Sequence, residues 1–139
     1  MTKKEAMRQT HQEDTLLALG FTREEAESLR RISMTLNRWH ERECGNEFGC
    51  IEREEGTDKP FWRRADGERG YDMPDREKGA LKRLTSIVEA RNEREDAPFP
   101  LGYYIQTDPR GAALYILRPG DVPAGQDPGA HYSRGICVY

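Results

Sequence analysis

The chain has 139 residues and a mass of 16.0 kDa, which fits one domain with one hydrophobic core. Charged residues make up 34% of it, hydrophobic residues 35%, and the net charge is −3, so whole-chain charge gives no reason to expect strong non-specific binding to nucleic acid. No apolar run approaches the roughly 20 residues that cross a bilayer, and the polar first ten residues contain no secretory signal core. We therefore expect a cytoplasmic protein whose three cysteines are free thiols.

Two helix starts carry the same motif, a threonine followed three residues later by a glutamate. Thr10 and Glu13 predict a short helix over residues 10–19, capped by Gly20 and preceded by a flexible N-terminus over residues 1–9. Thr22 and Glu25 predict a longer helix that runs to about residue 43. Its apolar residues recur every three or four positions and share one face: Ala26, Leu29, Ile32, Leu36 and Trp39.

Glycine and proline are frequent over residues 45–74 and leave two short strand-like runs, 50–53 and 61–64, joined by a loose hairpin loop. Residues 65–72 are predicted to be a mobile loop. A third helix opens at Pro74 and Asp75. Its apolar stripe consists of Ala80, Leu81, Leu84, Ile87 and Val88.

The last third of the chain is typical of a sheet. Strands are predicted over residues 101–107 and 112–117, joined by a type I turn from Asp108 to Gly111, and over residues 135–139 after a loop rich in proline and glycine. The predicted order is helix, helix, strand, strand, helix, strand, strand, strand. We therefore predict a single α+β domain over residues 10–139, with the helices packed on one face of a small antiparallel sheet.

Histidine and cysteine residues suggest one metal site. His40 and Cys44 lie four residues apart on one helix face, and Cys50 and Cys137 could complete a Cys3His zinc site. No CxxC pair accompanies them, so small buried thiols at a helix end are the simpler interpretation, and we expect no cofactor. The pairs Cys44–His40 and Cys137–His131 lack any local signature of thiol catalysis, and no known phosphate-loop or hydrolase motif is present. We therefore expect no enzymatic activity.

Basic residues gather at the end of the second strand-like run and along the third helix. The candidate nucleic-acid contacts are Arg63, Arg64, Lys78, Lys82 and Arg83. Aromatic residues on the neighbouring strands suit the stacking of bases from a single strand. Acidic residues interleave with these cations almost everywhere, so a solvated surface of mixed charge is the alternative.

Four segments, 36–45, 74–84, 108–116 and 132–139, resemble a small family of proteins from bacteriophages, prophages and other mobile elements of proteobacteria. That family has no established activity. The resemblance implies a context, namely a bacterial cytoplasm and a small accessory role.

Accessory proteins of mobile elements often act by binding. The leading hypothesis is a non-enzymatic protein that docks on a host or element-encoded protein, for instance to inhibit a bacterial defence system as anti-CRISPR proteins do. The candidate anchors are Trp62, Tyr103, Tyr104 and Arg110, and one residue of the pair Phe61 and Trp62 should point outward from its strand. A nucleic-acid-binding accessory protein and a small zinc-binding protein are the alternatives.

Overall fold

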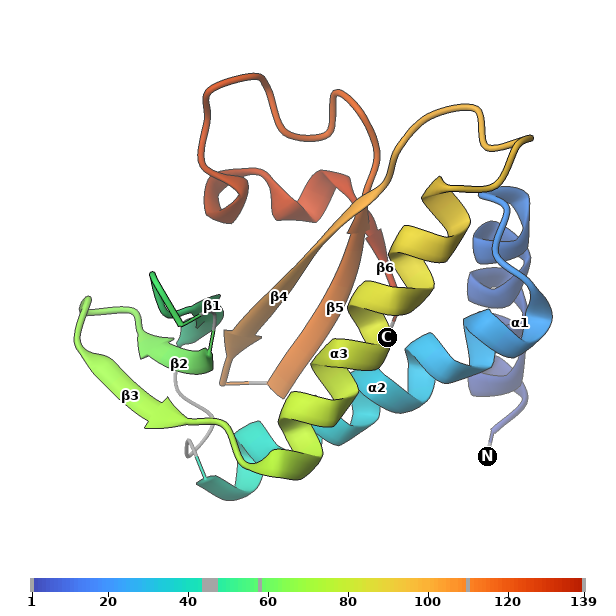
Figure 1. Cartoon of the computed structure of the whole chain (residues 1–139). Helices are drawn as coiled ribbons and strands as arrows, with labels where there is room; N and C mark the ends of the chain where they lie inside the picture. The colour runs from blue at the N-terminus through green and yellow to red at the C-terminus, as the bar shows by residue number, and fades with distance from the viewer. Residues whose placement is uncertain (1, 44–47, 58, 110, 139) are drawn as a thin grey trace.

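The computed structural model describes residues 2–43, 48–57, 59–109 and 111–138. The helices are α1 (Lys3–Ala18), α2 (Arg23–Glu43) and α3 (Asp75–Asn92), and the strands are β1 (Gly49–Arg53), β2 (Pro60–Arg64), β3 (Arg69–Asp72), β4 (Gly102–Asp108), β5 (Gly111–Leu117) and β6 (Ile136–Cys137). The predicted α+β class with an antiparallel sheet is confirmed, and the sheet has one strand more than expected, β3 (Figure 1).

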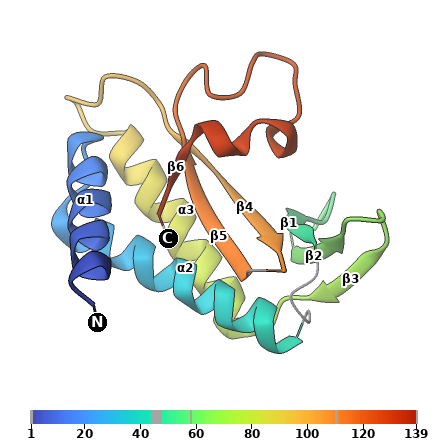
Figure 2. The same cartoon turned by 180° about the vertical axis from the view of Figure 1, so that it is seen from behind.

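The sheet has the strand order β3-β2-β1-β4-β5-β6, and every pairing is antiparallel. Strands β1 and β4 pair at its centre, with Gly49 opposite Thr107 and Cys50 opposite Gln106. This pairing attaches the hairpins of the middle of the chain to the C-terminal strands. Helix α1 lies at the end of the molecule away from β3, as Figures 1 and 2 both show. None of the described helices combines the length and the apolar character that crossing a membrane requires.

The second helix forms as predicted, and its capping motif is visible atom by atom. The Thr22 amide donates to Glu25 Oε1 at 2.9 Å, and the Glu25 amide donates to Thr22 Oγ1 at 3.1 Å. The preceding Gly20 has a φ of 99°, the left-handed conformation that glycine adopts without strain. All five residues of the predicted apolar stripe are at most 3% exposed, so this helix face is part of the core.

Two predicted boundaries are wrong. Helix α1 begins at Lys3, so Thr10 lies inside it and residues 3–9 have helical backbone, because good helix formers there extend the helix past the capping motif. The predicted loop over residues 65–72 is half strand, since Arg69–Asp72 forms β3. Gly70 lies so close to the Trp62 ring that a side chain there would collide with it. This close packing explains why a glycine, which in a sequence usually indicates a loop, occupies this position in a strand.

Two arginines near the end of α3 hold the turn between α1 and α2. Arg91 is 1% exposed, and its guanidinium donates to the Leu19 carbonyl at 2.7 Å and to the Phe99 carbonyl. Arg94 donates to the Gly20 carbonyl at 2.6 Å and lies 2.7 Å from the Glu25 carboxylate. These carbonyls end helices or lie in loops and have few backbone partners, so the two side chains join three segments of the chain. We call Arg91 and Arg94 the arginine clamp.

Candidate functional site

Of the four predicted protein-binding anchors, the three that the structure describes do not form one surface. Trp62 is buried at 1% exposure, and its indole N–H donates to Thr107 Oγ1 at 3.0 Å. Tyr103 and Tyr104 are both half-buried and, as consecutive residues of β4, point to opposite faces of the sheet. Arg110 lies outside the described residues.

Phe61 and Trp62 do point to opposite faces, yet both are buried. The Trp62 ring packs against the ring of His40 from α2, with centroids 5.9 Å apart, and stacks on Tyr71 at 6.0 Å. On the other face, the guanidiniums of Arg63 and Arg69 cover the Phe61 ring at 5.0 and 4.0 Å from its centroid. The expectation of an exposed aromatic anchor in this pair is therefore wrong.

The three predicted zinc ligands that the structure describes, His40, Cys50 and Cys137, do not lie together. Cys50 on β1 and Cys137 on β6 are separated by β4 and β5, which places them about 14 Å apart at the usual strand spacing. His40 lies on the opposite face of the sheet, buried against Trp62. Cys44 lies outside the described residues. Among the residues described, no group of three or more histidine, cysteine, aspartate or glutamate side chains is placed to hold a metal ion.

The thiol of Cys50 is held in its protonated form. Burial, with the nearby carboxylate of Glu52, raises the pKa of the Cys50 thiol above its ordinary value. Burial and the neighbouring thiol raise the pKa of Tyr104, whose hydroxyl is hydrogen-bonded to Cys50. His131, considered as a partner for Cys137, is hydrogen-bonded through its ring to the side chain of Gln126. A protonated thiol is a poor nucleophile.

The structure divides the predicted basic cluster. Arg63 forms an ion pair with Glu52 and donates to the Gly67 carbonyl at 2.9 Å, so its donors are used within the sheet. Arg64 lies 3.2 Å from the Asp66 carboxylate. Lys78 and Lys82 instead line a groove, and Arg83, next to Lys82 in the chain, is exposed but not part of the lining.

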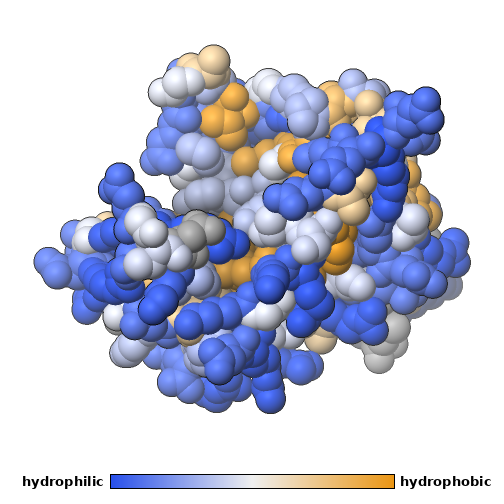
Figure 3. Space-filling view, in the orientation of Figure 1, coloured by the Kyte–Doolittle hydropathy of each residue, from blue (hydrophilic) through white to orange (hydrophobic). Residues whose placement is uncertain are grey.

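We call this recess the α3 groove. It has a volume of about 530 Å³ and lies between α3 and the strands β1, β2 and β4. Its lining residues are Arg53, Pro60, Lys78, Lys82, Thr85, Ser86, Glu89 and Tyr103. Figure 3 shows this side of the molecule, where hydrophilic side chains follow α3 and the β1–β3 region and white and orange, more hydrophobic surface is visible between them.

The α3 groove is positively charged on a negatively charged molecule. It has three cations, Arg53, Lys78 and Lys82, against one carboxylate, Glu89, whereas the whole chain has a net charge of −3. Lys78 and Lys82 are four residues apart and so share one face of α3. Within the described ranges, neither ammonium group has a hydrogen bond or an ion pair. Both are therefore available to a ligand.

Hydroxyl groups line the next part of the groove. Thr85 Oγ1 lies 3.1 Å from the Tyr103 hydroxyl and 3.5 Å from Nη2 of Arg53. These contacts connect α3 with β4 and β1 and fix the orientation of the Tyr103 ring. Tyr103, a predicted protein-binding anchor, thus shares a site with two of the predicted nucleic-acid contacts.

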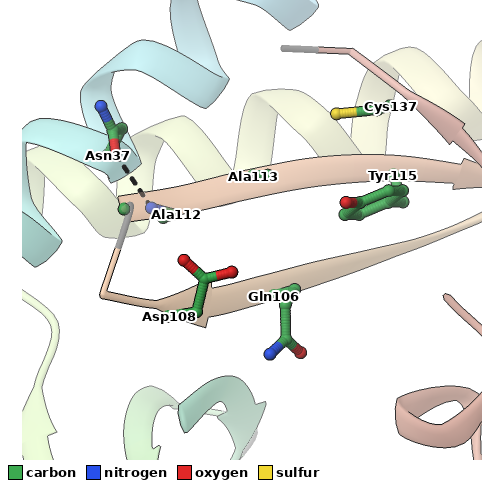
Figure 4. Close-up of a pocket in the computed structure, with 8 residues that line it drawn as sticks. Asn37, Gln106, Asp108, Ala112, Ala113, Tyr115 and Cys137 are labelled. Atoms are coloured by element: carbon green, nitrogen blue, oxygen red, sulfur yellow. Dashed lines mark hydrogen bonds between the residues drawn. The ribbon is translucent and has the colours of Figure 1, made fainter. Parts of the chain in front are cut away.

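A second recess, of about 260 Å³, opens beside the β4–β5 hairpin (Figure 4). Gln106 and Asp108 come from β4, Tyr115 from β5 and Cys137 from β6, with small residues of β5 between them. Asn37 of α2 is fixed at one end, where its side-chain oxygen accepts from the Ala112 amide at 2.9 Å. Its described lining presents one carboxylate with neutral polar groups, so it lacks the concentration of charge that distinguishes the α3 groove.

The sequence contained part of the signal for the groove. The pair Lys78 and Lys82 was visible at helical spacing, but Arg53, Thr85 and Ser86 were missed. Arg53 joins the site because β1 pairs with β4, and the contacts of Thr85 with Arg53 and Tyr103 place α3 beside these strands. Comparison with protein-family models, curated proteins and solved structures found no match. The resemblance to proteins of phages and mobile elements therefore stays a prediction.

Proposed function

We propose that this protein is a non-enzymatic accessory protein that binds nucleic acid through the α3 groove. The observation that carries the proposal is the pair of ammonium groups of Lys78 and Lys82, which line a groove and have no partner in the part of the chain that the structure describes. A cation that is hydrogen-bonded or paired within the fold can contribute to stability, whereas a solvated cation beside a recess contributes mainly attraction for an anion.

The net negative charge of the chain does not oppose this proposal. Salt screens charges over about 8 Å at physiological ionic strength, so a phosphate in the groove interacts mainly with the local cations. Each lysine that neutralises a phosphate also releases a condensed counterion, which drives binding at low salt. The Thr85 and Ser86 hydroxyls are further donors for phosphate or sugar oxygens.

The test compares matched neighbours on α3. Binding of a fluorescently labelled oligonucleotide is measured by anisotropy over a series of salt concentrations for the wild type, for Lys78→Gln with Lys82→Gln, and for Arg83→Gln. If both lysines contact phosphates of a single strand, the plot of log K against log salt becomes less steep in the double variant, and the magnitude of its slope falls by about 1.4. Arg83→Gln removes one cation of the same helix outside the groove and should leave the slope almost unchanged.

Two results would contradict the proposal. One is the absence of binding to single-stranded or duplex DNA or RNA at the lowest salt concentration. The other is a change in slope of about 0.7 for Arg83→Gln, half that of the double variant, which would show that binding responds to overall charge and has no preferred site.

Docking on a host or element-encoded protein, including a defence complex, is a second candidate. It is favoured by two exposed aromatic residues in the β1–β3 region, Phe48 at 57% and Tyr71 at 53% exposure. A partner that covers them would use the aromatic contacts common at protein interfaces. Affinity purification from the bacterial host, with Tyr71→Ser as the variant that should lose the partner, tests this alternative.

A further inference from the structure

The α3 groove changes in chemical character along its length. Lys78, Lys82, Thr85 or Ser86, and Glu89 follow one another at helical spacing on the wall that α3 contributes. At a rise of 1.5 Å per residue, this series is about 16 Å long. One end is cationic, the middle has hydroxyl groups, and the other end has a carboxylate.

The cationic end suits a phosphate and the other end does not. Lys78 and Lys82 attract a phosphate, whereas the Glu89 carboxylate repels one. Tyr103, which also lines the groove, supplies an aromatic ring, and its hydroxyl contact with Thr85 holds that ring in place. An aromatic side chain in a basic groove is the combination that stacks bases of an unpaired strand.

The size of the groove restricts the nucleic acid further. A volume of about 530 Å³ is in the range of sites that enclose a small molecule or a part of one. A duplex is far wider than such a recess and keeps its bases stacked inside, so it would contact only the rim of the groove. A single strand has both a narrow backbone and accessible base faces.

Building on the proposed function, we infer that the α3 groove binds a single strand, with neighbouring phosphates at Lys78 and Lys82 and a base against Tyr103. The site thereby recognises one nucleotide unit of the strand, and the rest of the strand continues on both sides of that unit. Sequence readout is not required, because every base offers a ring face for stacking.

The deciding experiment uses the wild-type protein and oligonucleotides of equal length and charge. Binding is compared for a single strand, the same strand with abasic sites throughout, and the corresponding duplex, with a free nucleoside monophosphate as competitor. We expect the intact strand to bind at least about fivefold more tightly than the abasic strand, since one stacked base contributes that much. The duplex should bind more weakly than the single strand, and the mononucleotide should compete poorly because it lacks the neighbouring phosphates.

Tyr103 variants locate the base. Tyr103→Leu should remove the preference for the intact strand over the abasic one, and Tyr103→Phe, which keeps the ring, should retain that preference even though total affinity falls. The oligonucleotide comparison needs no variant, so the inference stays testable if Tyr103→Leu does not fold.

Each other outcome has a distinct meaning. Equal binding of intact strand, abasic strand and duplex would overturn the inference and leave the proposed function standing. Displacement by the mononucleotide at equal concentration would also overturn it, in favour of a free nucleotide as ligand. No binding of any nucleic acid would end both proposals.

Discussion

The two ends of α3 use their cations in opposite ways. At the C-terminal end, the guanidiniums of Arg91 and Arg94 are bonded to carbonyl groups of the α1–α2 turn, and Arg91 also to that of Phe99. Nearer the N-terminal end, Lys78 and Lys82 line a groove and reach no partner among residues 2–43, 48–57, 59–109 and 111–138. The helix and the two residues after it thus contain one pair of cations bonded within the fold and one pair that we propose for an external ligand.

This difference follows from the side chains. The planar guanidinium has several donors in a fixed arrangement and is weakly hydrated, so it can be buried between carbonyl groups. Burial, with the positive charge of Arg94 nearby, lowers the pKa of Arg91, but an arginine remains charged at neutral pH. A lysine ammonium is compact and strongly hydrated, and it stays at the surface. Basic residues in a sequence therefore indicate a binding site only after the buried ones are identified.

The largest effect is expected at the buried member of the arginine clamp. Arg91→Ala removes the donors to Leu19 and Phe99 and leaves both carbonyls without these bonds, so the free energy of unfolding should fall by about 3 kcal/mol. Urea denaturation followed by circular dichroism measures the loss. Arg91→Lys keeps the charge but not the forked geometry and should give a smaller loss. A loss below about 1 kcal/mol for Arg91→Ala would contradict the structural role.

A smaller effect is expected at the other arginine. Arg94 is partly exposed, and its contacts with Gly20 and Glu25 are screened by solvent. Arg94→Gln should therefore lower the free energy of unfolding by about 1 kcal/mol. Because Glu25 also belongs to the capping motif, combining Arg94→Gln with Thr22→Ala should give a non-additive change. Strict additivity in that double-mutant cycle would show that Arg94 and the capping motif contribute independently to stability, which would contradict this prediction.

The smallest effect on stability is expected in the groove. Lys78→Gln with Lys82→Gln should change the free energy of unfolding by less than about 0.5 kcal/mol per site, because neither side chain has a partner among the residues that the structure describes. Thermal and urea unfolding of the same preparations used for binding give this value. A destabilisation equal to that of Arg91→Ala would remove the contrast between the two ends of α3.

Local chemistry made much of the fold predictable. The reciprocal bonds of Thr22 and Glu25 and the apolar stripe ending at Trp39 follow from spacing alone, and both are present. The runs that became β1, β2, β4 and β5 were recognised from their composition. Strand β3 was missed because its short polar sequence has no alternation, and Gly70 serves the packing of Trp62.

Contacts between distant segments were not predictable. The polar stretch after residue 90 gave no sign that Arg91 is buried, because its acceptors lie in other segments, at Leu19 and Phe99. The sequence indicates only part of the candidate groove, namely two lysines that share one helix face. The residues that the strands contribute, among them Arg53 and Tyr103, are brought together by the β1–β4 pairing, which no local pattern specifies.

The burial of the indole rings determines what optical spectroscopy of this protein will report. The sequence contains two tryptophans, Trp39 and Trp62, and each is 1% exposed. Neither lines the α3 groove, so a dissolved quencher or an incoming oligonucleotide has no direct access to either fluorophore. Intrinsic emission will therefore follow loss of the core during denaturation, and occupancy of the groove requires a reporter on the ligand.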